Sequence, residues 1–266
     1  MSSNQTVPVA EQKRLREKLL KKHNVANIIT HWFNVLIWLM LLPTGIAIIS
    51  SPRLGVSPIW MQEWFRNMFG GTANLITFHY TVGFVWISVL LFNIFVGWKK
   101  YFVPFAMHRV LLDKDDIDWL MIKPFQMMGF MKDKPLPPQD AYNGGQKLYM
   151  FVVILGSIGI MISGPVMVFK AFFPPILKQI AQPLHFLSVF SIVAGILIHV
   201  YMGAIFPEEK EGLFSMFSGK VSAWYAKMHH EKWYWEKIQA ELDWEDEINQ
   251  KIASETKEHQ EIPLEN

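Results

Sequence analysis

The chain has 266 residues, of which 51% are hydrophobic, and a formal net charge of only +2. So small a charge gives no reason to expect nucleic acid as a partner. The chain has no cysteine, which excludes disulfides, thiolate zinc sites, cysteine-bound iron–sulfur clusters and covalently attached c-type haem.

Four long apolar runs follow a polar, basic arm, residues 1–30, and none of the runs contains Asp, Glu, Lys or Arg. A helix needs about 20 apolar residues to cross a bilayer core of about 30 Å, and a soluble helix would show a polar face. We therefore predict four membrane-spanning helices. In chain order the runs are Trp32–Ile49, Phe78–Trp98, Leu148–Phe169 and Gln182–Phe206.

The segments between and after the runs differ in character. The stretch Pro58–Phe69, PIWMQEWFRNMF, is compatible with an amphipathic helix lying flat on the membrane and equally with an ordinary hydrophobic loop. The loop Lys99–Lys147 is long and contains KDKPLPPQD. The tail beyond Glu236 is acidic and helix-prone, which is typical of a solvated or disordered tail; contact with another subunit is the alternative.

Lysine and arginine alternate between rich and poor segments. The arm carries six of them, the first loop two, the central loop eight, the third loop two and the tail seven. The positive-inside rule places both termini and the central loop in the cytoplasm. The predicted fold is an all-α membrane protein with a four-helix bundle. Its predicted parts are an arm (1–30), a transmembrane domain (31–206) and a cytoplasmic tail (207–266).

Four histidines lie at membrane depth in this topology. His79 and His185 fall in the outer half, and His31 and His199 in the inner half. His185 and His199 are fourteen residues apart, so they face the same side of one helix at depths that differ by roughly 21 Å. An imidazole at membrane depth is costly unless it is paired, and neutral imidazole is a good axial ligand for haem iron. We predict two stacked haems b, each held by two histidines from two helices.

Two further patterns leave alternatives open. Gly83, Gly195 and Gly203 lie four residues from a predicted ligand, where they could let a macrocycle approach the backbone or could serve helix packing. The remaining histidines lie in polar segments, where solvated or headgroup-facing positions are expected. A metal site at the adjacent pair His229–His230 has little support. These five are His23, His108, His229, His230 and His259.

The chain resembles the cytochrome b (gamma) subunit of membrane-bound formate dehydrogenases, within a wider group that includes the diheme b subunits of nickel–iron hydrogenases. The resemblance runs from about Asn27 to Glu236. The motifs are NIITHWFN, FHYTVGF, YNGGQKLYM, HFLSVFSIVAGILIHVYM and SGKVSAWYAKMHHEKWY, and the last separates this branch from the hydrogenase type.

The resemblance implies that His79 and His185 ligate the outer haem b, and that His31 and His199 ligate the inner one. It also implies that Asn143, Gly145 and Gln146 line a menaquinone pocket in which the inner ligand on the fourth helix takes part. Asn and Gln offer amide donors and acceptors for a quinone carbonyl, and glycine allows close approach. NGGQ is also typical of a turn that begins a helix. Three tail aromatics would anchor at the membrane interface: Trp224, Trp233 and Tyr234.

The implied function is electron transfer in the inner membrane of a bacterium. An iron–sulfur subunit, bound to a catalytic dehydrogenase subunit, would deliver electrons to the outer haem, and the inner haem would reduce menaquinone with protons from the cytoplasm. Alternatives are a diheme cytochrome b of another quinone-linked dehydrogenase or hydrogenase, a proton transporter, and a cofactor-free membrane anchor. A transporter would place charged residues in the helices, where the sequence has none.

Overall fold

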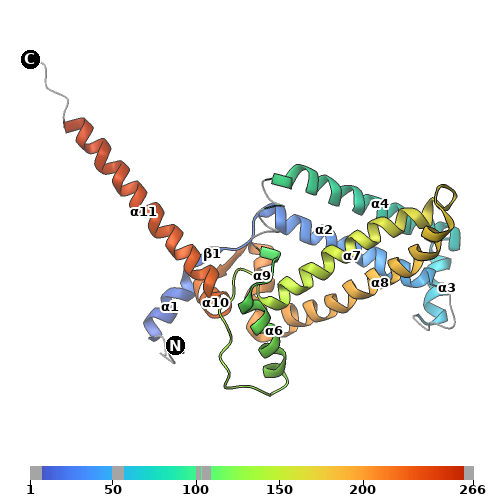
Figure 1. Cartoon of the computed structure of the whole chain (residues 1–266), viewed down its shortest axis with the longest axis horizontal. Coiled ribbons are helices and arrows are strands. Elements are labelled where there is room, and N and C mark those ends of the chain that lie inside the picture. Colours follow the sequence, from blue (N-terminus) through green and yellow to red (C-terminus); the bar gives the residue numbers. More distant parts are fainter. Residues whose placement is uncertain (1–7, 50–56, 100–102, 104–108, 261–266) are drawn as a thin grey trace, which may run out of the picture. The chain divides into compact units, whose positions relative to one another are not determined.

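A computed structural model describes residues 8–49, 57–99, 103 and 109–260. Its described residues fall into two compact units (Figure 1). The first, here called the helical bundle, covers residues 23–111 and 146–219. The second, here called the joint unit, gathers residues 1–22, 112–145 and 220–266. One predicted surface histidine, His108, lies outside the described residues.

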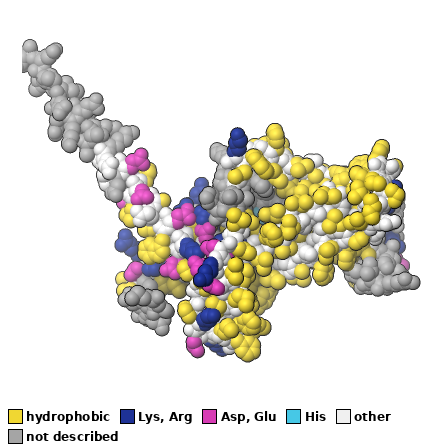
Figure 2. Space-filling view, viewed as in Figure 1, with side chains coloured by type: hydrophobic (Ala, Val, Ile, Leu, Met, Phe, Trp, Pro, Cys, Tyr) yellow, Lys and Arg dark blue, Asp and Glu magenta, His cyan; other side chains and the backbone are white. Residues whose placement is uncertain are grey.

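The structure confirms four helices that are long and apolar enough to span a membrane. The shortest has 24 residues, which is about 36 Å of helix and exceeds the bilayer core. Few of their side chains are buried, many of the exposed ones are apolar, and Figure 2 shows hydrophobic side chains over the visible face of the bundle. Lipid is the solvent that suits such a surface. The four helices are α2 (Val25–Ile48), α4 (Thr72–Gly97), α7 (Gly144–Val168) and α8 (Pro175–Val200).

The four spans meet around a small apolar core, to which each contributes one buried residue. Ile37, Trp86, Ile160 and Ile192 come from α2, α4, α7 and α8 respectively. The indole of Trp86 donates a hydrogen bond to the Asn34 side chain at 2.8 Å, so its polar atom is satisfied inside the bundle. On α8 this core lies between the positions of the two histidines.

Helices α7 and α8 approach closely because α7 carries small residues at the crossing. A Cβ added to Gly156 would lie 2.7 Å from Ile192, and one added to Gly159 would lie 2.2 Å from the Ser188 hydroxyl. Small residues four or fewer positions apart commonly let membrane helices pack backbone to backbone.

Short elements complete the bundle. Helix α3 (Ile59–Met68) confirms that the stretch Pro58–Phe69 is helical, with Trp60 and Trp64 exposed. Helix α8 continues into a π-helical turn, η4 (Tyr201–Ile205), followed by η5 (Pro207–Glu209) and α9 (Lys210–Ser218). The turn η3 (Lys170–Phe172) precedes α8.

The joint unit is built from three segments that are far apart in sequence. The antiparallel strands β1 (Leu19–Lys21) and β2 (Lys220–Ser222) pair the arm with the tail, an addition to the predicted all-α fold. The helices of this unit are α1 (Val9–Glu17), α6 (Lys114–Met127), α10 (Ala223–His229) and α11 (Glu231–Gln260).

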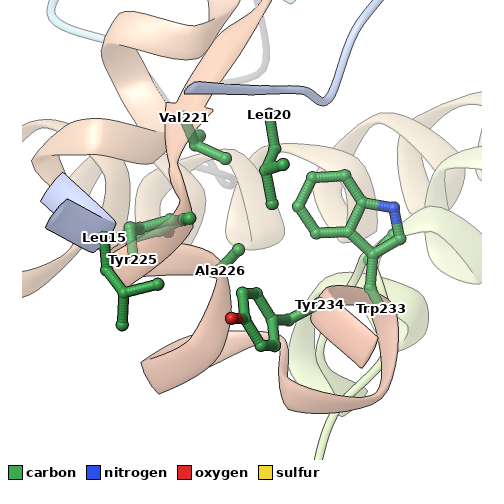
Figure 3. Packing of buried hydrophobic residues seen from close by; sticks show 9 residues of the cluster. Leu15, Leu20, Val221, Tyr225, Ala226, Trp233 and Tyr234 are labelled. Atoms are coloured by element: carbon green, nitrogen blue, oxygen red, sulfur yellow. The ribbon is translucent and has the colours of Figure 1, made fainter. Parts of the chain in front are cut away.

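Aromatic residues of the tail form the core of the joint unit (Figure 3). Trp233 and Tyr234 are 3% and 6% exposed and pack with Leu20, Val221 and Ala226. Their expected role as membrane-interface anchors is therefore wrong: both rings bury apolar surface inside a folded unit. The arm, the central segment and the tail thus share one core.

Candidate functional site

The structure brings together the two histidines that were predicted at inner depth. The ring centres of His31 on α2 and His199 on α8 are 6.4 Å apart, with an angle of 59° between the ring planes. Two imidazoles that share one metal ion, each through a bond of about 2 Å, would have ring centres within about 6 Å of each other. The spacing therefore suits one shared metal ion between the rings.

The inner pair lies against the ring of Tyr149 on α7. The Tyr149 ring stacks on His199 at 5.6 Å, and it fills the space beside Gly195, where a Cβ would lie 2.3 Å from Tyr149 Cε2. Gly195 thus serves helix packing and gives no room for a macrocycle. A Cβ on Gly83 or Gly203 would meet no described atom within 4 Å.

The residues predicted as the outer pair are His79 on α4 and His185 on α8. Each ring is held by a hydroxyl on a neighbouring helix. Thr44 Oγ1 on α2 lies 2.9 Å from His79 Nδ1, and Ser163 Oγ on α7 lies 3.0 Å from His185 Nδ1. Gly45 adds space for the His79 ring, since a Cβ there would lie 3.1 Å from His79 Cε1.

These hydroxyls determine which ring nitrogen carries the proton. Thr44 donates its proton to the Met40 carbonyl at 2.7 Å, and Ser163 donates to the Gly159 carbonyl at 2.6 Å. Toward the imidazole each oxygen can therefore only accept, so Nδ1 of His79 and of His185 must donate. The lone pair is then on Nε2, the nitrogen that would bind a metal. Neither Thr44 nor Ser163 was singled out in the sequence.

The four imidazoles fit haem as the group that they would bind. Among the described residues no three His, Asp or Glu side chains come together as a metal site. A pair of imidazoles supplies two ligands, and a porphyrin supplies the four that an iron ion would otherwise lack. His31 Nδ1 is buried without a hydrogen-bond partner among the described side chains and backbone.

The predicted quinone residues lie where α7 begins. Asn143 directly precedes the helix, and Gly145 and Gln146 are in its first turn. A Cβ on Gly145 would lie 3.1 Å from the Trp119 ring and 3.4 Å from Asn143 Oδ1, so the Asn143 amide lies over this glycine. The helix-start interpretation of NGGQ is correct, and it does not conflict with a binding role.

Gly144 is a position that the sequence analysis missed. A Cβ there would lie 2.5 Å from the backbone oxygen of Asp116, so only glycine lets this turn pack on the start of α6. The Gly144 N–H donates to Gln139 Oε1 at 2.7 Å, which satisfies one of the free amides at the helix start. Lys147, counted only as a loop charge, is 3% exposed.

Two histidines outside the bundle pairs are also buried. His230 is 0% exposed and His23 is 9% exposed, so the expectation of solvated positions is wrong for both. His230 Nδ1 lies 2.7 Å from the Asp140 carbonyl oxygen, and His230 Nε2 lies 2.8 Å from Lys22 Nζ. The neighbouring His229 instead stacks on Tyr225, so the pair His229–His230 does not converge on a metal site.

Comparison with known proteins places the chain among membrane cytochromes. The family model of prokaryotic cytochrome b561 matches residues 22–219. The chain is 25% identical to the formate dehydrogenase cytochrome b556 subunit of Haemophilus influenzae over 86% of this chain and 87% of that protein. It is 27% identical to the nitrate-inducible formate dehydrogenase cytochrome b556 subunit of Escherichia coli K12, over 87% of this chain and 98% of that protein.

A second cytochrome b556 subunit of Escherichia coli K12 formate dehydrogenase is 22% identical over 82% of this chain. These relatives confirm the family resemblance predicted from the motifs. The family model covers most of the chain, including all four spans and all four bundle histidines. The chain therefore belongs to the prokaryotic cytochrome b561 family and is a multi-pass membrane cytochrome b.

Proposed function

We propose that the chain is the cytochrome b subunit of a formate dehydrogenase-like complex, and that it passes electrons across the membrane to menaquinone through two haems b. The observation that supports the proposal is the approach of the His31 and His199 rings, with His79 and His185 each held by a hydroxyl elsewhere in the bundle. The outer pair is His79 with His185, and the inner pair is His31 with His199.

Each pair would hold one haem by bis-histidine ligation, and the haem supplies reversible one-electron chemistry at its iron. The protein supplies orientation and environment. Thr44 and Ser163 hold Nδ1 of the outer rings, which would leave Nε2 free to bind iron, and such a hydrogen bond would increase the basicity of the ligand. The apolar core of the bundle would keep water away from an electron path between the two haems.

The quinone would bind beside the start of α7. The amides of Asn143 and Gln146 offer donors and acceptors to a quinone carbonyl and hydroxyl, while the space beside Gly145 is filled by the Trp119 ring. Protons for the reduced quinone would come from the side on which the joint unit lies. Basic residues are concentrated on that side, so we assign it to the cytoplasm and the membrane to the bacterial inner membrane.

The electron donor would be an iron–sulfur subunit carrying a catalytic dehydrogenase subunit, on the outer face. The three similar proteins are all named as subunits of formate dehydrogenases, which is the support for formate as the primary donor. This assignment makes the chain a partner in an oxidoreductase and leaves substrate oxidation to another subunit.

The electron path is tested in the purified complex by measuring haem reduction and haem reoxidation separately. Formate should reduce the b-type haem of the wild type, and menadione should reoxidise it. Asn143→Ala should leave reduction by formate unchanged and slow reoxidation. Reduction by hydrogen but not by formate would move the chain to a hydrogenase-type complex, and a folded protein without haem would make it a cofactor-free anchor.

A further inference from the structure

A fully buried imidazole lies at the junction of α10 and α11, outside both bundle pairs. His230 is 0% exposed, and the Tyr225 and Trp233 rings flank it at 5.7 and 6.4 Å. A buried polar ring is retained at low cost only where both nitrogens have partners. Both nitrogens of His230 have one.

The partners fix the tautomer of His230. The Asp140 carbonyl oxygen can only accept, so Nδ1 donates to it at 2.7 Å. The lone pair is then on Nε2, which accepts from Lys22 Nζ at 2.8 Å. The Lys22 ammonium also lies within 5.9 Å of the Tyr142, Tyr225 and Trp233 ring centres, where cation–π attraction holds it. His230 therefore links the arm, the central segment and the tail.

The central segment that His230 contacts leads directly into the start of α7. The backbone N–H of Lys232 donates to the Gln139 carbonyl at 3.0 Å, next to the Asp140 carbonyl that His230 holds. The Gln139 side chain in turn accepts from the Gly144 N–H. Residues 139–144 are thus fixed at both ends. The tail holds the Gln139 and Asp140 carbonyls, and the Gln139 side chain holds the N–H of Gly144, the first residue of α7. Asn143 lies inside this fixed segment.

We propose that His230 is a positioning residue for quinone binding: its Nδ1–H holds the Asp140 carbonyl and so fixes the segment that presents Asn143 and Gly145. This inference rests on the proposed quinone site. His230 is far from Asn143 in the sequence. Its hydrogen bond to the Asp140 carbonyl nevertheless acts on the backbone three residues before Asn143. If this segment moved freely, ordering it when quinone binds would cost free energy and lower the affinity for quinone.

Two substitutions of similar size separate the two bonds of His230. In His230→Asn the amide nitrogen replaces Nδ1 and can still donate to the Asp140 carbonyl. In His230→Gln the longer side chain reaches the position of Nε2 and Lys22 but leaves the Asp140 carbonyl without its donor. The matched control is His229→Ala, which removes the neighbouring imidazole from the Tyr225 ring and leaves the His230–Asp140 bond in place.

The measurement is menadione reduction by the purified complex, with haem content and thermal stability recorded for each variant. His230→Gln should raise the KM for menadione about fivefold, the effect of one lost hydrogen bond, and leave kcat within about twofold. His230→Asn and His229→Ala should retain the wild-type KM. Haem content should be equal in all variants.

Asn143→Ala distinguishes the two ways in which this result could fail. If Asn143→Ala raises the KM while His230→Gln does not, or if His230→Asn raises it as much as His230→Gln, the positioning role is overturned and the quinone site stands. If Asn143→Ala leaves the KM unchanged, the quinone site itself is wrong, and the inference falls with it.

Discussion

Thr44 offers the sharpest single test of how the bundle would hold a haem. Its side chain is 3% exposed, and its hydroxyl accepts from His79 Nδ1 at 2.9 Å while donating to the Met40 carbonyl. Thr44→Val keeps the shape and removes the oxygen. His79 Nδ1–H is then left without this acceptor inside an apolar bundle, and its ring loses the contact that sets its tautomer.

The expected cost follows from the buried donor left unsatisfied, about 1–3 kcal/mol. Since each 1.4 kcal/mol is a factor of ten, binding of the outer haem should weaken roughly 5-fold to 150-fold. The loss of a hydrogen bond from Nδ1 also makes the ligand less basic, so the midpoint potential of that haem should rise.

The assay is haem retention per chain in the presence of a haem-scavenging protein, together with a redox titration. Ser191→Ala is the matched control: Ser191 makes the same kind of bond to a helix carbonyl, Leu187, but is only partly buried and holds no histidine. The control should behave as wild type. Equal retention and equal potentials in Thr44→Val and wild type would refute the proposed role of the hydroxyl.

The joint unit gives two further predictions. Gly144→Ala should lower the stability of this unit by about 1–3 kcal/mol, because its Cβ would meet the Asp116 backbone, and the midpoint of thermal unfolding measures the loss. Burial alone would lower the pKa of Lys232, but hydrogen bonds to Asp113 and Asp115 and their charges raise it above its ordinary value. That stabilisation is present below pH 10.5 and is lost as the pH rises through the raised pKa. Because these groups are about one third exposed or more, Lys232→Met should cost at most about 1 kcal/mol at pH 7, and the difference from wild type in urea unfolding should shrink above pH 10.5 and in high salt. A difference that grows at high pH would contradict the ion pairing.

The four spans could be predicted because a helix that crosses a membrane needs about 20 consecutive uncharged, mostly apolar residues, and such a run is visible in the sequence. The approach of His31 to His199 could also be predicted, since helix rise converts sequence position into depth. Depth cannot identify the partners of each ring, however. Thr44 lies 35 residues before His79, and Ser163 lies 22 residues before His185, so neither hydroxyl has a spacing that marks it in advance.

The joint unit could not be predicted from local patterns. The strand pair joins Leu20 to Val221, two short segments about 200 residues apart, each too brief to show a period. The family resemblance implied that Trp233 and Tyr234 anchor at the membrane interface. They are buried because the arm and the central segment cover them, which depends on tertiary contacts alone.

The central claim is that two haems are held by two separate histidine pairs, and haem stoichiometry in paired substitutions tests it most directly. Wild type should contain two b-type haems per chain by pyridine haemochrome. The double variant His79→Ala/His185→Ala should lose one haem, the same one that each single variant loses. The cross-pair variant His79→Ala/His199→Ala should lose both. One haem per chain in the wild type, or the loss of both haems in the within-pair variant, would contradict the account.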